Sequence, residues 1–429
     1  MVCITPVRIA LAAPAASAAP HAPRPWWRRS SRSLMQQRLL ALPLLLAGLL
    51  ASALTLAQPV ATASAPLLYI GQQNLPRALS FEGTTIGGLS GLDRDDAGHF
   101  FALSDDRSQN GPARFYTLTI DLARFQRSNA AGMDGIRFTG VHRLRTLVGG
   151  VYPPLGVDPE GIRYDPKSRR LFWTDEGRRS AASVLRPALR EMTLTGEWVR
   201  DLPLPAPFLP SGSSAGNQPG DSGVRDNLSL ESLAFDPVRR VAWIASENAL
   251  LQDGPASNPK QSTPVRLQAI EVDSGRAGPA HVYMIDPIVV PALLPGVFTT
   301  NGLTEVLVLG EGEFLMVERS FTPLSNNSIR LYHASSRGAT DVAALPALDG
   351  AMWQPMRKRL LLDLGTLVND DGSGVIPDNI EAVSWGPLSA AGRPTLILLS
   401  DDNFSATQVT QFIALEVVGP LTDPSEAAR

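Results

Sequence analysis

Residues 156–177 (GVDPEGIRYDPKSRRLFWTDEG) place one carboxylate just before an apolar run and two more just after the next one. The DPK turn sequence separates the two runs, so the stretch is predicted to form a β-hairpin. Because both ends of a hairpin lie at the same edge of a sheet, Glu160, Asp175 and Glu176 are expected to lie close together. Carboxylate oxygens are the ligands that Ca²⁺ prefers, and about six to eight oxygens surround the ion.

The same pattern recurs in four further copies along the chain. A copy has Glu, a small residue and an apolar residue, then a strand, a turn, and a second apolar strand ending in Ser or Thr before acidic residues. The first copy begins with Ser90 in place of Glu, and the fourth lacks the Ser or Thr. The carboxylates at the ends of these hairpins are Asp105, Glu160, Asp175, Glu176, Glu231, Glu247, Glu305, Glu318, Glu381 and Asp401. We predict that they form two rings and are the metal ligands.

A third strand is expected after each hairpin, and its first polar residue is Arg in four copies and Gln411 in the last. Repeats of about 70 residues, each with about four strands, are typical of a β-propeller. The last copy ends after its third strand, whereas residues 67–81 (LLYIGQQNLPRALSF) offer a strand to complete it. We therefore predict an all-β fold: a β-propeller of five to six four-stranded antiparallel blades, closed by an N-terminal strand. A two-sheet sandwich is the alternative, but it does not explain the repeated acidic signature.

In a propeller, hairpin ends of one kind meet at one face, so the acidic rings should surround the mouth of the central channel. Such rings are stable only if cations enter, if arginines neutralise them, or if some carboxylates stay protonated. We predict Glu160, Glu176 and Arg319 as catalytic residues. Arg319 is included because it stands where other copies have a second acid or Asn. The arginines predicted to bind substrate are Arg107, Arg114, Arg190, Arg266 and Arg330. The alternative is that the Glu and Arg residues form structural ion pairs between blades.

Residues 1–65 differ from the rest of the chain. Residues 39–57 form an uninterrupted apolar run, and the Ala-Ser-Ala sequence at 63–65 fits a signal-peptidase cleavage pattern. We predict an upstream extension with a cleaved signal peptide at 1–65 and a single propeller domain at 66–429. The expected location is periplasmic or secreted, without a stable membrane anchor. An uncleaved anchor is the alternative.

Removal of residues 1–65 changes the charge of the chain. That segment holds six arginines and no acid, so the remainder carries 32 basic and 41 acidic side chains, a formal charge of −9. This charge argues against nucleic acid or an anionic membrane as partner. The only cysteine, Cys3, is removed as well, which excludes thiolate chemistry. We expect a monomer that acts on a small molecule.

Other catalytic patterns are weak. The G-x-S-x-G match at 212–216 lies in a Gly/Ser-rich stretch rather than in the strand–turn–helix context of a nucleophile elbow. The four histidines after residue 65 show neither H-x-x-H nor H-E-x-x-H spacing. A serine–histidine hydrolase and a zinc site are therefore unsupported.

Several blocks resemble a known family. GLSGLDRDDAGHFFALSDDR, DPEGIRYDP, LESLAFDP, NGLTEVLVL and NIEAVSWGP are similar to blocks of the phytase-like, "esterase-like activity of phytase" family of exported bacterial proteins. The resemblance covers residues 80–417. It implies a propeller related to calcium-dependent phytases, which hydrolyse phosphate esters at a carboxylate-rich channel mouth. The phytases' own catalytic motif has no residue-by-residue match here, so no catalytic residue is carried over.

Three functions remain open on the sequence. The first is a Ca²⁺-assisted hydrolase of phosphate or related esters. The second is a propeller lactonase or carboxylic ester hydrolase with one metal. The third is a non-catalytic envelope protein whose rim binds a glycan or protein.

Overall fold

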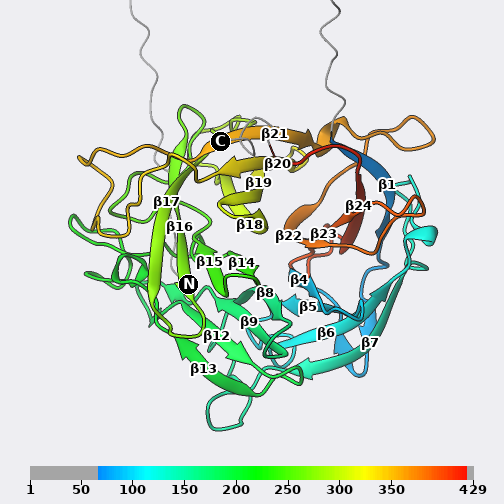
Figure 1. The fold of residues 1–429 in the computed structure, drawn as a ribbon, viewed down its shortest axis with the longest axis horizontal. Coiled ribbons are helices and arrows are strands. Elements are labelled where there is room, and N and C mark those ends of the chain that lie inside the picture. The colour runs from blue at the N-terminus through cyan, green and yellow to red at the C-terminus, as the bar shows by residue number, and fades with distance from the viewer. Residues whose placement is uncertain (1–65, 423–429) are drawn as a thin grey trace, which may run out of the picture. The chain divides into compact units, whose positions relative to one another are not determined.

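The computed structural model describes residues 66–422; the predicted signal peptide lies outside this range. These residues form five four-stranded antiparallel sheets, or blades, around a central axis (Figure 1). Blade 1 contains β4 (Leu89–Arg94), β5 (Phe100–Ser104), β6 (Arg114–Ile120) and β7 (Ile136–Arg143). Blade 2 contains β8 (Pro159–Asp165), β9 (Arg170–Asp175), β12 (Ala188–Met192) and β13 (Trp198–Leu202). Blade 3 contains β14 (Ser232–Asp236), β15 (Val241–Ala245), β16 (Thr263–Glu271) and β17 (Ala277–Ile285).

Blade 4 contains β18 (Thr300–Gly310), β19 (Glu313–Phe321), β20 (Ser328–Ser335) and β21 (Arg357–Asp363). Blade 5 contains β22 (Asn379–Trp385), β23 (Thr395–Asp401), β24 (Gln411–Val417) and β1 (Leu67–Asn74). Two small hairpins, β2 (Ser80–Phe81) with β3 (Thr84–Thr85) and β10 (Arg178–Arg179) with β11 (Val184–Leu185), lie outside the blades. The described helices are three 3-10 turns at Leu122–Arg124, Ala206–Phe208 and Leu364–Thr366. Within 66–422, no helix has the length and apolar character to cross a membrane.

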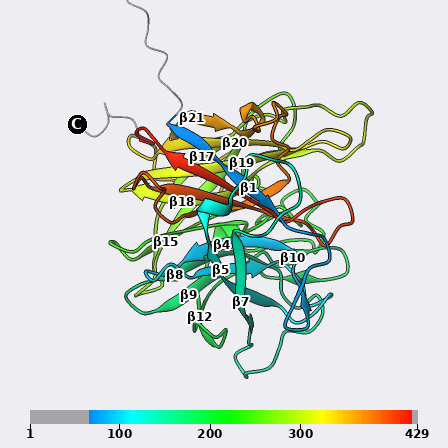
Figure 2. The ribbon, with the colours of Figure 1, turned by 90° about the vertical axis from the view of Figure 1, so that its right-hand side faces the viewer.

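The N-terminal strand closes the ring. β1 pairs antiparallel with β24, from Leu67 opposite Val417 to Asn74 opposite Gln411. Figure 2 shows β1 in blue beside the red C-terminal strand. The predicted propeller and its closure are confirmed, and the number of blades is five.

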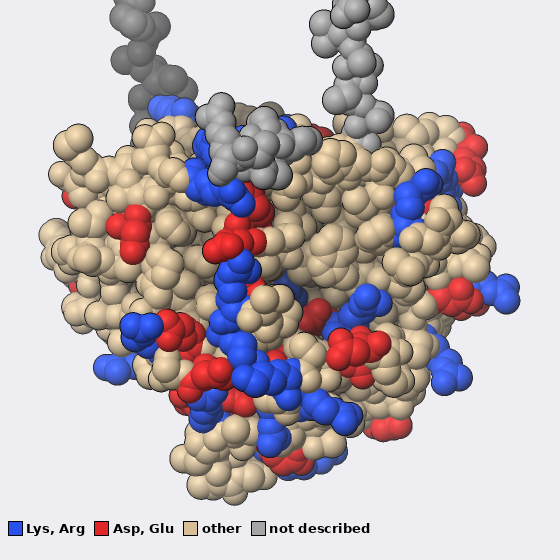
Figure 3. All heavy atoms as spheres, viewed as in Figure 1, with Lys and Arg blue, Asp and Glu red and all other residues tan. Residues whose placement is uncertain are grey.

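The core lies between neighbouring blades. Leu315 and Leu331 of blade 4, for example, pack in one buried cluster with Val383 and Leu398 of blade 5. Both faces of the inner strands are therefore buried, which explains their nearly continuous apolar sequences. On the face in Figure 3, basic side chains form a band from the centre toward the lower edge, and acidic side chains flank it.

Each of four inner strands has a register shift near its start. The shifts leave unpaired residues between Leu89 and Gly91, Pro159 and Ile162, Leu303 and Glu305, and Ile380 and Ala382. A β-bulge of this kind turns a side chain away from the regular alternation. The bulged residue is thus Thr304 in blade 4 and Glu381 in blade 5. Glu305 is the first paired residue after its bulge, the position that Ala382 has in blade 5.

A buried arginine joins the blades at the axis. Arg163 is 2% exposed, and its guanidinium donates to backbone carbonyls of four blades, those of Leu92, Ile162, Val306 and Val383. Its Nη2 also lies 2.7 Å from Oε2 of Glu305. The other oxygen of Glu305 accepts from the backbone N–H of Leu233 in blade 3. This pair therefore contacts all five blades.

Candidate functional site

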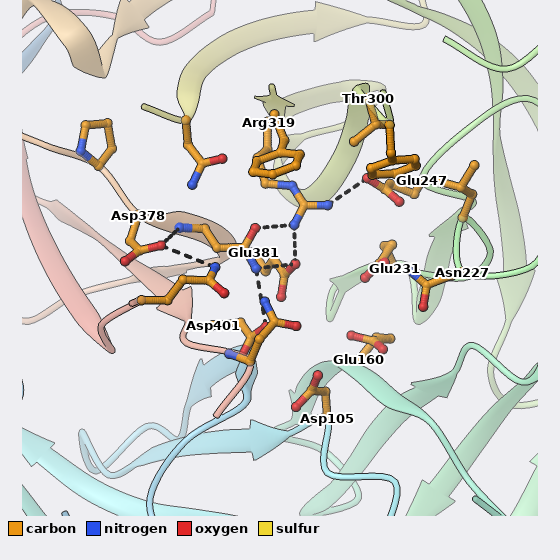
Figure 4. Close-up of a pocket in the computed structure, with 18 of the residues that line it drawn as sticks. Asp105, Glu160, Asn227, Glu231, Glu247, Thr300, Arg319, Asp378, Glu381 and Asp401 are labelled. Atoms are coloured by element: carbon orange, nitrogen blue, oxygen red, sulfur yellow. Dashed lines mark hydrogen bonds and ion pairs between the residues drawn. The ribbon is translucent and has the colours of Figure 1, made fainter. Parts of the chain in front are cut away.

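A pocket of about 540 Å³ lies where the open ends of the inner hairpins converge. Eight carboxylates line it: Asp105, Glu160, Glu176, Glu231, Glu247, Asp378, Glu381 and Asp401. The lining includes two arginines, Arg107 and Arg319, and no Lys or His among the described residues. Figure 4 shows carboxylates from several blades pointing into this space. Seven of the ten predicted metal ligands and all three predicted catalytic residues thus meet in one pocket.

Arg319 neutralises one side of the pocket. Its Nη2 donates to Oε1 of Glu247 at 2.8 Å, and its Nη1 donates to Oε1 of Glu381 at 2.5 Å (Figure 4). Glycine at 302 makes room for this arrangement, because a Cβ there would collide with the Glu247 carboxylate. Burial lowers the pKa of the Arg319 guanidinium, whereas the negative charges of Glu381, Glu247 and Glu231 raise it. The net effect is a pKa above the usual value.

Three carboxylates converge on the opposite side. One oxygen from each of Asp158, Glu160 and Glu176 lies within 4.8 Å of the others, and all three residues are buried. Arg107 binds this group, with Nε 2.7 Å from Asp158 and Nη2 3.8 Å from Glu176. Burial raises the pKa of Asp158 to about 7, although Arg107 lowers it. The backbone N–H of Ser229 donates to Glu176 at 2.8 Å and fixes its carboxylate.

Three pocket carboxylates have no partner within residues 66–422. No hydrogen bond or ion pair holds the side chains of Asp105, Glu160 or Glu231, and Oδ1 of Asp105 is completely buried. Burial raises the pKa of all three well above the usual range, and neighbouring carboxylates raise it further. For Glu160 those neighbours include Glu231 and Glu176. The same causes, burial and nearby carboxylates, raise the pKa of Asp401.

The remaining predicted ligands lie away from the pocket. Asp175 accepts from Arg190 and from the backbone N–H groups of residues 158 and 177. Glu318 accepts from Tyr283 and Lys358. Glu305 pairs with Arg163 because the bulge at Thr304 shifts it one position along the strand. These three carboxylates are partnered in the fold.

Four of the five predicted substrate arginines also lie outside the pocket. Each pairs with an acid of its own blade region: Arg114 with Asp106, Arg190 with Asp175, Arg266 with Asp253, and Arg330 with Asp363. Arg114 and Arg266 are fully buried. These four arginines form ion pairs, as in the alternative interpretation, but each pair lies within one blade and not between blades as that interpretation expected. Of the five arginines predicted to bind substrate, only Arg107 lines the pocket.

Sequence reasoning missed Asp158 and Asp378. Both stand just ahead of an inner strand, two residues before Glu160 and three before Glu381. The signal is present in the sequences DPEG and DNIEA, where an Asp stands shortly before the leading Glu of the copy. Asp378 also fixes a loop, because its carboxylate accepts from the backbone N–H of Val409.

The carboxylates fit a hard divalent cation. Oxygen-only donors, the spacing of Asp158, Glu160 and Glu176, and the unpartnered Oδ1 of Asp105 are compatible with such an ion. Where no arginine pairs with them, buried neighbouring carboxylates coexist only if a cation binds or if some of them take up protons. The buried acidic cluster can therefore hold a metal ion.

Fold and site define a five-bladed β-propeller with a carboxylate-rich axial pocket. Residues 84–404 match the model of the phytase-like family, described as esterase-like activity of phytase. The chain belongs to this family, as the resemblance implied. Among curated proteins, none matches the sequence.

Solved structures show distant similarities. An exo-β-1,3-galactanase of Phanerochaete chrysosporium matches with a TM-score of 0.39 and 11% identity over 80% of this chain and 64% of that chain. The arabinanase Arb43A of Bacillus subtilis has a TM-score of 0.36 and 11% identity, over 81% and 96% of the two chains. A periplasmic gluconolactonase of Pseudomonas aeruginosa has a TM-score of 0.32 and 13% identity, over 79% and 88%. The chain thus spans less than two thirds of the galactanase.

Proposed function

We propose that the protein is an exported, phytase-like hydrolase that depends on Ca²⁺ and cleaves phosphate or related esters in the carboxylate pocket. The observation that carries the proposal is the set of unpartnered carboxylates, Asp105, Glu160 and Glu231. Glu160 also belongs to the three-carboxylate group with Asp158 and Glu176. Isolated buried carboxylates are costly unless a cation offsets their charge. A pocket that gathers them is therefore suited to binding a metal ion.

Asp158, Glu160 and Glu176 would hold the ion. A bound Ca²⁺ supplies positive charge for an ester oxygen and for a nearby water. Arg107, whose side chain is 34% exposed, lines the pocket and would donate to a phosphate oxygen. Arg319 would act as a positioning residue, because its nitrogens already bind Glu247 and Glu381.

A second candidate has one observation in its favour. Only one group of three carboxylates within residues 66–422 has metal-ligand spacing, which suits a single ion. A propeller lactonase or carboxylic ester hydrolase needs no more than one. Export to the periplasm or medium, a monomeric state, and a small-molecule substrate rather than nucleic acid are also part of the proposal, and they rest on the composition.

The test compares two aryl esters. Purified protein is assayed with phenyl phosphate and phenyl acetate in millimolar Ca²⁺ and in EDTA. We expect phosphate release that EDTA abolishes and Ca²⁺ restores. Turnover of phenyl acetate alone would favour the second candidate, and absence of both activities would favour a binding protein.

A further inference from the structure

Apolar side chains from several loops line part of the pocket. The apolar residues that line the pocket are Leu228, Phe298, Phe321, Ile376 and Pro377. Phe298 is 62% exposed and Ile376 is 53% exposed. The rings of Phe298 and Phe321 have centroids 6.4 Å apart. Exposed phenylalanine at the rim of an acidic pocket indicates a surface that contacts an apolar ligand group.

The loop that carries Phe298 extends this surface. Between β17 and β18, Leu293, Leu294 and Val297 are 90%, 67% and 40% exposed. Leu324, in the loop after β19, is fully exposed, and its neighbour Ser325 lines the pocket. Single exposed apolar residues are ordinary, but these two loops carry several of them and each also contributes a residue to the pocket lining.

The charge of the pocket restricts the rest of the ligand. Eight carboxylates face two arginines, and the described lining has no Lys or His. Arg319 already binds two carboxylates, and Arg107 binds Asp158. A substrate with many phosphates would meet uncompensated negative charge once its first phosphate was bound. The pocket therefore suits a ligand with one acidic group.

We propose that the substrates are amphiphilic phosphate monoesters, with the phosphoryl group at the Asp158–Glu160–Glu176 side and an aryl or alkyl group against Phe298 and Phe321. The inference rests on the proposed function and names its substrate class. The reaction is hydrolysis: a water oxygen bonds to phosphorus, the ester P–O bond breaks, and the leaving oxygen takes a proton from that water.

Binding of two inert phosphonates tests the inference without turnover. Calorimetry in millimolar Ca²⁺ compares phenylphosphonate with methylphosphonate on wild type, Phe298→Ala and Val238→Ala. Val238 is the control, because it is 86% exposed in the hairpin turn at the other end of blade 3. We expect phenylphosphonate to bind about tenfold more tightly to wild type, the factor that partial burial of one ring supports. Phe298→Ala should reduce this preference severalfold, and Val238→Ala should keep it.

Three results would overturn the inference: equal affinity for the two phosphonates, binding of neither, or tighter binding of inositol hexakisphosphate than of phenylphosphonate. Hydrolysis is measured separately on phenyl phosphate and glycerol phosphate. If the phenyl preference in binding is present but neither ester is cleaved, the proposed function fails and the apolar specificity stands. If both esters are cleaved equally well and the phosphonates bind alike, the function stands and the inference fails.

Discussion

Arg319 and Asp401 occupy the same place in their blades. Arg319 pairs with Gly302, two residues ahead of the bulged residue of blade 4, and Asp401 pairs with Asn379, two residues ahead of the bulged residue of blade 5. One position of the repeat thus carries a cation in blade 4 and an acid in blade 5. The cation bonds to acids of blades 3 and 5, Glu247 and Glu381, so it offsets charge that its own blade does not contribute.

Replacement of Arg319 by Gln is expected to destabilise the protein by about 3–5 kcal/mol in EDTA, because two buried carboxylates lose their counter-ion. Urea unfolding at pH 7.5 measures the change. Arg276→Gln is the control, since Arg276 forms an exposed pair with Glu271, and it should leave stability close to wild type. An Arg319→Gln protein as stable as the control would show that the carboxylates are protonated and do not need the arginine.

Calcium should stabilise the folded protein. A ligand that binds only the native state adds about 2.7 kcal/mol at 100 times its dissociation constant, which corresponds to a melting temperature higher by about 5 °C. Scanning calorimetry in EDTA and in millimolar Ca²⁺ measures this shift. Identical curves would favour a purely structural role for the carboxylates.

Glu160→Gln keeps the volume of the side chain and removes one charge from the three-carboxylate group. We expect the Ca²⁺ affinity to fall at least about tenfold. Loss of a residue that only hydrogen-bonds to a metal ligand already has an effect of this size, and Glu160 is proposed as a ligand itself. Melting in EDTA should rise, because repulsion with Glu231 and Glu176 falls. Activity should drop and recover at higher Ca²⁺.

The control for this variant is Glu311→Gln, in the exposed turn between β18 and β19. A destabilised Glu160→Gln protein with unchanged, calcium-independent turnover would remove Glu160 from the site.

Glu305 predicts a pH dependence of stability. Burial raises the pKa of the Glu305 carboxyl, and Arg163 and two backbone N–H groups lower it. Burial has the larger effect, so the pKa is about 7. In the unfolded chain the pKa is near its ordinary value, so between the two values only the folded state holds the proton. Glu305 therefore contributes stability that is complete below about pH 4.5 and lost as pH rises through 7, up to about 3 kcal/mol.

Glu305→Gln, which resembles the protonated form, is expected to match wild type near pH 5 and to be more stable at pH 8. Urea titrations of both proteins at the two pH values, in the presence of Ca²⁺, measure the difference. A variant that is less stable at pH 8 would show that the ion pair with Arg163 outweighs the cost of burial.

Export predicts cleavage near residue 65. The apolar run at 39–57 and the Ala-Ser-Ala sequence at 63–65 motivate it, with Ala57 as a second candidate site. N-terminal sequencing of protein from the cell envelope should find a chain that begins close to Pro66. Recovery of an intact 39–57 segment in membranes would contradict the proposal.

The repeat made the propeller predictable, but it could not place every side chain. Glu160, Glu231 and Glu381 reach the pocket as expected, whereas Glu305 has the same apparent spacing and lies at the axis. The difference is the bulge at Thr304, whose position depends on hydrogen bonds between strands that the sequence pattern does not encode. One extra residue turns a side chain to the other face of a strand.

The arginines show a second limit. Arg114 and Arg266 have the same place in the repeat, but each is bound by an acid from a loop, Asp106 and Asp253, at different sequence separations. Partner choice depends on how loops fold back over the blade. Arg107 does line the pocket, and its place directly after the acids that end a hairpin is the sequence signal for that position.

The pairing of Leu67 with Val417 has a consequence for the order in which the chain can fold. The first strand of the domain to be synthesised finds its partner only after residue 417 has been made. Until then β1 has no sheet, and blade 5 exposes an unpaired edge. No N-terminal fragment of this domain can complete its own ring, so the native state is available only to the full-length domain.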